Sequence, residues 1–140
     1  MFTKLLVAYN GSDGSERALS AGIELAKCLG QELYVVMVEV ELPRHSSLLY
    51  EMDTRKDQSD TYFEQLSRKA ISLAQIKGVT LHTEVITGHK VGALVDYVER
   101  HGFDLILVGF HGHSALTERG IGSTALGLIT NAPCSVQVVK

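Results

Sequence analysis

The sequence predicts an α/β fold: a single open, parallel, five-stranded sheet with helices on both faces, formed by one domain that covers residues 1–140. Short apolar runs alternate along the chain with longer segments in which apolar residues recur every three or four positions. The short runs are typical of strands buried on both faces, and the longer segments are typical of amphipathic helices. Regular alternation of strand and helix favours parallel strands joined by crossover helices.

Five runs have the composition expected of these strands. They are rich in β-branched and other apolar residues, and turn-forming residues lie between them and the helical segments. The runs cover residues 4–8, 33–40, 79–87, 104–108 and 136–139.

Four segments between these runs have helical spacing. In the first, Leu19, Ile23 and Ala26 recur on one face, after the N-cap candidates of residues 12–15 and before a glycine stop at Gly30. The four helices are expected over residues 16–29, 62–76, 91–98 and 123–132. Residues 41–60 mix a proline, serines and many charges, which predicts a long, mobile, irregular connection.

Composition narrows the classes of function. The formal net charge is −3 and no stretch concentrates Lys and Arg, so nucleic acid is not expected as a partner. No run approaches the 18 or so apolar residues of a membrane span, and no membrane partner is expected. The N-terminus has no signal-peptide pattern, which favours a cytoplasmic location.

The candidate site lies where two loops should meet. In open parallel sheets, ligands bind beyond the carboxyl ends of the strands at the point where the strand order reverses. The first and fourth predicted strands are expected to flank that point. They lead into the loops Tyr9-Asn10-Gly11-Ser12 and Gly109-Phe110-His111-Gly112.

Glycine spacing in the second loop points to a phosphate. Gly109, Gly112 and Gly122-Ser123 follow the pattern G-x2-G-x9-G-S. The last pair opens a helix, whose free N–H groups and dipole favour an anion, and the hydroxyls of Ser123 and Thr124 add donors. The pattern alone is equally compatible with ordinary turn glycines.

Longer stretches show a family resemblance. Residues 104–114 read DLILVGFHGHS and are similar to the DLIVMGTHGRS stretch of universal stress proteins, and residues 6–19 read LVAYNGSDGSERAL and resemble their VAVDGSEGSERAL. Gly122-Ser123-Thr124 matches the helix start of that family, and residues 133–139 resemble its CPVLVV ending. The resemblance spans the whole chain and implies a Rossmann-like fold of the adenine nucleotide alpha hydrolase-like type.

The resemblance also implies a function. The full glycine pattern is that of the ATP-binding branch, so the chain is expected to be a nucleotide-binding (ATP or AMP) stress-response regulatory protein with at most slow ATP hydrolysis. No catalytic residues are expected. The nucleotide-binding residues implied are Ala8, Tyr9, Asn10, Gly11, Ser12, Val38, Val108, Gly109, His111, Gly112, Gly122, Ser123 and Thr124.

Asn10 departs from the family pattern, which has an acidic residue after the first strand. An amide hydrogen-bonds a hydroxyl but brings no charge for Mg²⁺, so dependence on Mg²⁺ is doubtful. His111 and His113 lack a third ligand at a recognisable spacing, and no metal site is expected.

Two further readings concern catalysis and assembly. The alternative function is an ATP-using enzyme of the adenylylating ATP pyrophosphatase type, but residues 10–15 resemble the SGGKDS loop of such enzymes only faintly and lack its lysine.

The resemblance to universal stress proteins also implies a homodimer through the last strand. Val136, Val138 and Val139 suit such an edge.

Overall fold

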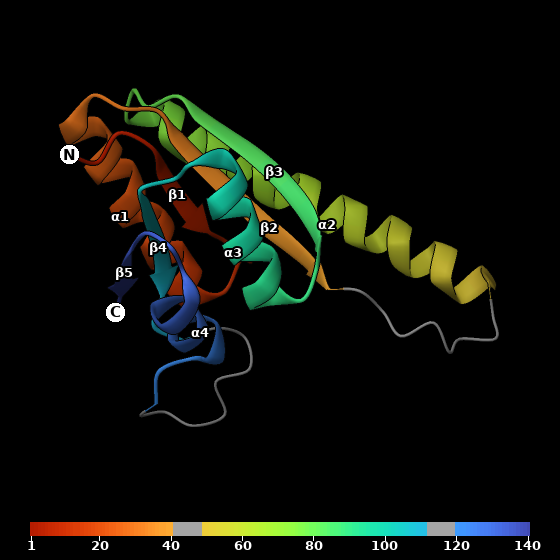
Figure 1. Ribbon diagram of the computed structural model, residues 1–140. Helices are drawn as coiled ribbons and strands as arrows, with labels where there is room; N and C mark the ends of the chain where they lie inside the picture. Colours follow the sequence, from red (N-terminus) through yellow and green to blue (C-terminus); the bar gives the residue numbers. More distant parts are fainter. Residues whose placement is uncertain (41–48, 112–119) are drawn as a thin grey trace.

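A computed structural model gives the fold of residues 1–40, 49–111 and 120–140 (Figure 1). Five parallel strands form one sheet in the order β3-β2-β1-β4-β5. The strands are β1 (Leu5–Ala8), β2 (Leu33–Val40), β3 (Leu81–Gly88), β4 (Leu105–Gly109) and β5 (Ser135–Val139). The helices are α1 (Asp13–Leu29), α2 (Leu49–Ile76), α3 (Lys90–His101) and α4 (Ser123–Asn131). The predicted fold class is confirmed.

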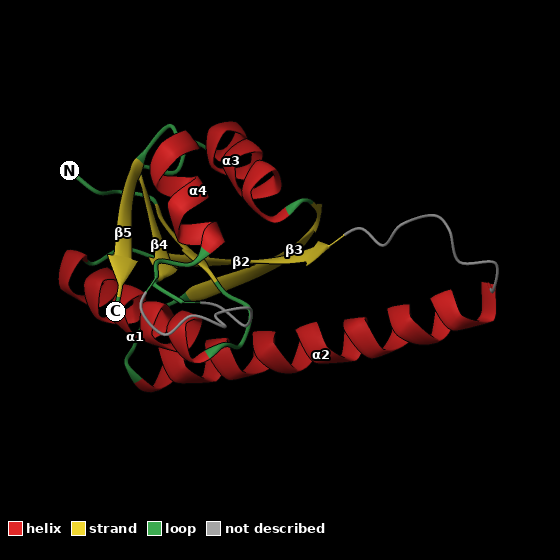
Figure 2. Ribbon diagram, turned by 90° about the horizontal axis from the view of Figure 1, so that it is seen from below, coloured by secondary structure: helices red, strands yellow, loops and turns green. Residues whose placement is uncertain are grey.

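Helices cover both faces of the sheet (Figure 2). Alternate strand residues point to opposite faces, so Leu5 and Val7 of β1 join a core under α1 and α2. Leu6 and Ala8 join a second core under α3 and α4. Every residue of β1 is buried, which explains its uninterrupted apolar sequence.

The strand order reverses between β1 and β4. Strand β1 pairs with β2 on one side and with β4 on the other, as predicted. At this point the first turn of α1 packs directly on the end of β4. A methyl group at Gly14 would overlap the carbonyl oxygen of His111, and one at Gly109 would overlap the backbone of Gly14. Glycine is therefore required at both positions by backbone-to-backbone packing.

Helix α2 corrects one prediction. The irregular connection predicted for residues 41–60 is wrong from residue 49 onward, where the chain is helical; residues 41–48 lie outside the described residues. Residues 49–60 contain neither glycine nor proline, and many of them favour helix. They escape detection because α2 extends past the sheet (Figure 1), so this part requires no apolar stripe. Its 28 residues correspond to about 42 Å.

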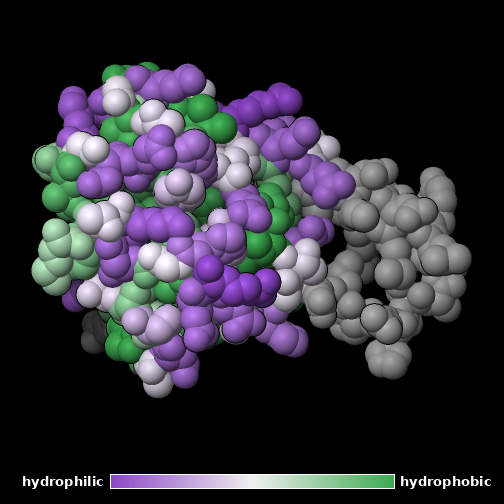
Figure 3. Space-filling view, turned by 45° about the horizontal axis from the view of Figure 1, so that its top comes forward, coloured by the Kyte–Doolittle hydropathy of each residue, from purple (hydrophilic) through white to green (hydrophobic). Residues whose placement is uncertain are grey.

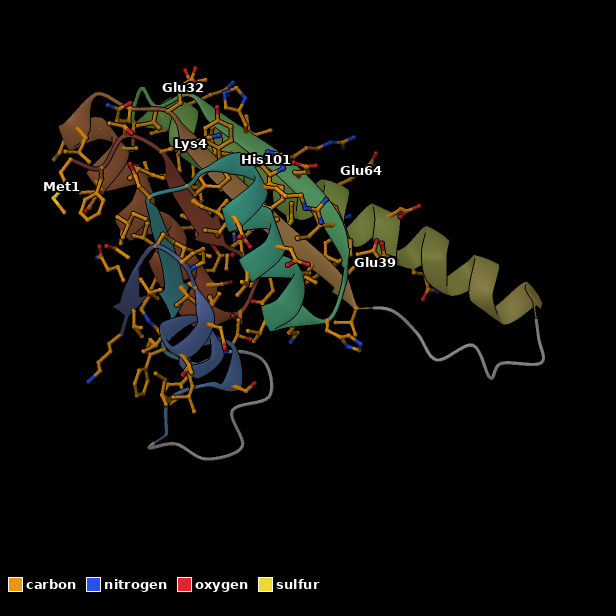
Figure 4. All side chains as sticks on the ribbon, viewed as in Figure 1. Met1, Lys4, Glu32, Glu39, Glu64 and His101 are labelled. Atoms are coloured by element: carbon orange, nitrogen blue, oxygen red, sulfur yellow. The ribbon has the colours of Figure 1, made fainter. Side chains whose placement is uncertain are left out.

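The amino ends of the strands are tied together by polar contacts. The carboxylate of Asp104 accepts hydrogen bonds from the backbone N–H groups of Thr3 (2.8 Å) and Lys4 (3.1 Å) and from the Thr3 hydroxyl (2.9 Å). Burial opposes the effect, but these donors hold the pKa of Asp104 below its usual value. Lys4 donates to the carbonyl oxygen of His101 (Figure 4). These contacts lie at the opposite end of the strands from the loops singled out above.

The surface drawn in Figure 3 intersperses hydrophilic and hydrophobic residues. Within residues 1–40, 49–111 and 120–140, no helix is both long enough and apolar enough to cross a membrane.

The contact between α1 and β4 leads to a stability prediction. Gly14→Ala is expected to lower the free energy of unfolding by about 3 kcal/mol or more, because backbone on both sides must move apart. The matched control is Gly92→Ala in α3, where a methyl group meets nothing within 4 Å. That change should stabilise by roughly 0.5–1 kcal/mol, the usual helix preference for alanine. Urea unfolding of both variants measures the difference, and equal stability of the two would contradict the packing argument.

Candidate functional site

A cavity of about 230 Å³ opens beyond the carboxyl ends of the central strands. Its floor is apolar and comes from the sheet face under α3 and α4, with Ala8, Val36, Val38 and Val108 contributed by the strands. Leu94 of α3 and Ala125 of α4 close the sides. The position is the one at which ligands of open parallel sheets bind.

The cavity gathers most of the residues predicted to bind a ligand. Those that line it are Ala8, Tyr9, Asn10, Ser12, Val38, Val108, Gly109, His111, Gly122, Ser123 and Thr124. Gly11 is not among the lining residues; with φ at 80° it lies against Tyr62 and Leu66 of α2. Gly112 lies outside the described residues, as does His113.

The loop between β1 and α1 is held by its own hydrogen bonds. Ser12 is the N-cap of α1, and its hydroxyl oxygen accepts from the N–H of Ser15 at 3.2 Å. The side-chain oxygen of Asn10 accepts from the Ser12 hydroxyl (2.6 Å) and N–H (3.1 Å). The Ser15 hydroxyl oxygen in turn accepts from the Asn10 N–H at 3.2 Å. These contacts fix the wall of the cavity before any ligand arrives.

Side chains of helix α2 bond to the same loop and to the start of α1. The Tyr62 hydroxyl donates to the carbonyl oxygen of Asn10 at 2.6 Å. Glu16 of α1 accepts from the Tyr9 hydroxyl (2.6 Å) and pairs with Lys69 of α2 (2.7 Å). Burial, the hydrogen bond to Glu16 and the charge of Glu16 all raise the pKa of Tyr9 above its ordinary value. Tyr9 therefore stays protonated as a donor.

The other wall forms where the chain leaves β4 and enters α4. The N–H of Gly122 donates to the carbonyl oxygen of Phe110 at 2.6 Å, which brings the two predicted glycine segments together. Gly122 is the N-cap of α4 and makes no side-chain cap, so within the described part of the chain the N-cap residue leaves the first N–H groups of this helix without a side-chain acceptor. The Nδ1 atom of His111 is buried and has no hydrogen-bond partner among the described residues.

The electrostatics of the cavity favour an anion. Ser12, Lys90 and Gly122 line it and mark the beginnings of α1, α3 and α4. Each helix start carries a partial positive charge. Within the described part of the chain no Asp or Glu lines the cavity, and no cluster of three or more His, Cys, Asp or Glu residues could hold a metal ion.

Sequence reasoning missed several lining residues: Ser15, Val36, Lys90, Leu94, Gly120, Ile121 and Ala125. Most of them carry no chemical signal, because apolar and small residues look alike in a core and in a ligand cavity. Lys90 and Ser15 are the exceptions. Lys90 directly follows the N-cap of α3 and Ser15 stands three residues after the N-cap of α1, and these positions in the first turn of a helix were the available signal.

Comparison with known proteins places the chain in a family. A model described as the universal stress protein family matches residues 1–140. The chain belongs to this family. It is 30% identical to the universal stress protein MJ0531 of Methanocaldococcus jannaschii, over 100% of this chain and 83% of that protein. It is also 30% identical to the universal stress protein YxiE of Bacillus subtilis, over 100% of both chains.

Solved structures of other universal stress proteins share the fold. UspA of Lactobacillus plantarum superposes with a TM-score of 0.89 at 24% identity, over 99% of this chain and 98% of that one. A protein of Archaeoglobus fulgidus in complex with dAMP has a TM-score of 0.73 at 20% identity, over 99% and 98%. One from Arabidopsis thaliana with AMP bound has a TM-score of 0.70 at 19% identity, over 99% and 91%. A universal stress protein in complex with cAMP has a TM-score of 0.73 at 22% identity, over 99% and 97%.

The support from α2 predicts how the loop responds to mutation. Tyr62→Phe removes the donor to the Asn10 carbonyl oxygen. It should lower the free energy of unfolding by about 1 kcal/mol and speed hydrogen exchange of the Ser12 amide, which Asn10 protects. Tyr34→Phe is the matched control, because no hydrogen bond joins the Tyr34 hydroxyl to the described residues. Unchanged Ser12 exchange in Tyr62→Phe would show that α2 does not hold the loop.

Proposed function

We propose that this universal stress protein binds an adenine nucleotide, ATP or AMP, and acts as a stress-response regulator rather than as an efficient enzyme. The observation that carries the proposal is the difference in chemistry between the floor and the rim of the cavity. Its floor is apolar, as the flat face of a base requires, while its rim is formed by the starts of three helices that suit a phosphate. The relatives that hold AMP, dAMP and cAMP make adenine the base of choice.

The residues suggest distinct roles for the two ends of the cavity. Val38, Val108 and Leu94 would contact the base. Ser123, Thr124 and the first N–H groups of α4 would bind the phosphate. His111 lines the cavity beside them, although its unpartnered Nδ1 atom is buried. Gly112, which the glycine pattern assigns to the same phosphate, belongs to this proposal as well.

The residues of the cavity also support at most slow hydrolysis of ATP. Phosphoryl transfer depends on charge stabilisation and on a positioned nucleophile, usually with Mg²⁺. Where a carboxylate would hold Mg²⁺, the loop has Asn10, whose side-chain oxygen already accepts two hydrogen bonds from Ser12. Binding is therefore proposed to proceed without Mg²⁺. No observation favours the adenylylating enzyme.

Calorimetric titration with AMP and ATP in excess EDTA tests the proposal. The parent should bind, and Gly122→Val should weaken binding by at least about tenfold, because a branched side chain at the N-cap of α4 fills the phosphate space. Thr130→Val is the control: it places the same side chain at an exposed position in the last turn of α4. Absence of binding by the parent would overturn the proposal. If Gly122→Val binds with the same affinity as the parent, the phosphate does not lie at the start of α4.

We also propose that the protein forms a homodimer through β5. This strand is at the edge of the sheet and pairs only with β4 among the described strands. The carbonyl oxygen of Val139 accepts from Phe110 beyond β4, so by alternation the backbone groups of Val136 and Val138 point to the open edge. On the neighbouring helix α4, Leu126 and Ile129 are 53% and 51% exposed, which extends the apolar edge.

Val138→Pro removes one edge N–H and should convert the dimer to a monomer, because proline at an edge blocks pairing but is tolerated by the strand. Val138→Thr, which keeps the N–H and the β-branched shape, should remain dimeric. Sedimentation measures both. A parent that is monomeric at micromolar concentration, or a folded Val138→Pro dimer, would rule out pairing through β5.

A further inference from the structure

Lys90 has an unusual place in the cavity. Among the described residues that line the cavity, it is the only Lys or Arg, and no acidic residue lines the cavity with it. It is the first residue of α3, directly after the N-cap His89. Lys90 is exposed and lines the cavity, so it lies at the rim and not in the apolar floor.

The position is unfavourable for a lysine in the free protein. The N-terminus of a helix carries partial positive charge, so a cation there is disfavoured. The first turn of α3 contains no acidic residue that would offset the repulsion. No ion pair joins Lys90 to another described residue. Nothing within the described chain therefore compensates this charge, and an anionic ligand would.

The starts of α3 and α4 border the same opening. The two helices pack closely, since a methyl group at Gly127 of α4 would stand 2.6 Å from the side chain of Val91 in α3. Lys90 precedes Val91, and both Lys90 and the first residues of α4 line the cavity. An ammonium group on a flexible stem reaches several positions from one backbone site, including those near the donors of α4.

We propose that Lys90 binds the phosphate of the nucleotide and supplies the positive charge that a metal ion supplies in other nucleotide sites. This inference rests on the proposed function and assigns to it a residue that the glycine pattern does not contain. A charged donor to phosphate forms stronger hydrogen bonds than a neutral one. Lys90 should therefore separate ligands by phosphate charge: it strengthens binding of AMP and contributes nothing to binding of adenosine, which has the same base and sugar.

The experiment compares AMP and adenosine on Lys90→Gln by calorimetry in EDTA. Affinity for AMP should fall about tenfold, and affinity for adenosine should be unchanged. The thermal midpoint of the ligand-free variant should equal or exceed that of the parent, because a cation has left the helix start. Lys90→Arg should retain most of the AMP affinity. Lys27→Gln, in the last turn of α1, is the control for loss of a surface charge.

The outcomes separate the two proposals. Parental AMP affinity in Lys90→Gln, or an equal loss for AMP and adenosine, would overturn the role of Lys90 and leave nucleotide binding intact. A parent that binds neither ligand would overturn the proposed function and the role of Lys90 together. The AMP affinity of the parent should also fall more steeply with NaCl concentration than that of Lys90→Gln.

Discussion

The contact between Gly14 and Gly109 is the constraint on which the site depends. Helix α1 begins so close to the end of β4 that no side chain fits at either residue. This contact holds the start of α1 against the end of β4, at the point where β1 and β4 pair and the strand order reverses. It therefore places the loop that follows β1 beside the loop that follows β4. A wider approach would leave two unrelated loops in place of the two walls of one cavity.

The two walls are held by different hydrogen bonds. On the side of β1, Asn10, Ser12 and Ser15 hydrogen-bond one another, and α2 holds the Asn10 carbonyl through Tyr62. On the side of β4, the N–H of Gly122 closes onto Phe110. The first wall uses its polar groups internally, whereas the start of α4 leaves its N–H groups uncapped. The asymmetry explains why the phosphate is assigned to α4 and not to α1, although both helices begin at the cavity.

The sequence predicts the fold well because a strand that is buried on both faces needs an uninterrupted run of apolar residues, which is visible in the sequence. The apolar run of β1 and the helical stripe through Leu19, Ile23 and Ala26 both reflect contacts that persist along an element. Residues 62–76 of α2 were predicted as a helix for the same reason, but residues 49–60 were missed, because the part of a helix that extends past the sheet requires no apolar face. Gly109 has a second reason to be glycine that the sequence does not reveal: it lines the cavity, as the prediction requires, and its missing side chain also makes room for Gly14.

The residues of the site also divide into those that the sequence could predict and those that it could not. The glycine and serine positions were predictable because they lie in two short segments with a fixed spacing. Lys90 was not, because its relation to the cavity depends on packing between elements far apart in the chain. Lys90 follows β3, an edge strand that contributes nothing else to the site. Only the crossing of α3 over the sheet brings its first residue to the start of α4.

The proposed nucleotide would also have a structural role in this arrangement. The loop after β1 belongs with α1 and α2 on one face of the sheet, while Lys90, Leu94 and the start of α4 belong to the other face. A ligand that contacts both sets of residues would link helices that lie on opposite faces of the sheet. A ligand that binds the folded state alone would also stabilise it, by an amount that rises with the logarithm of the ligand concentration above Kd.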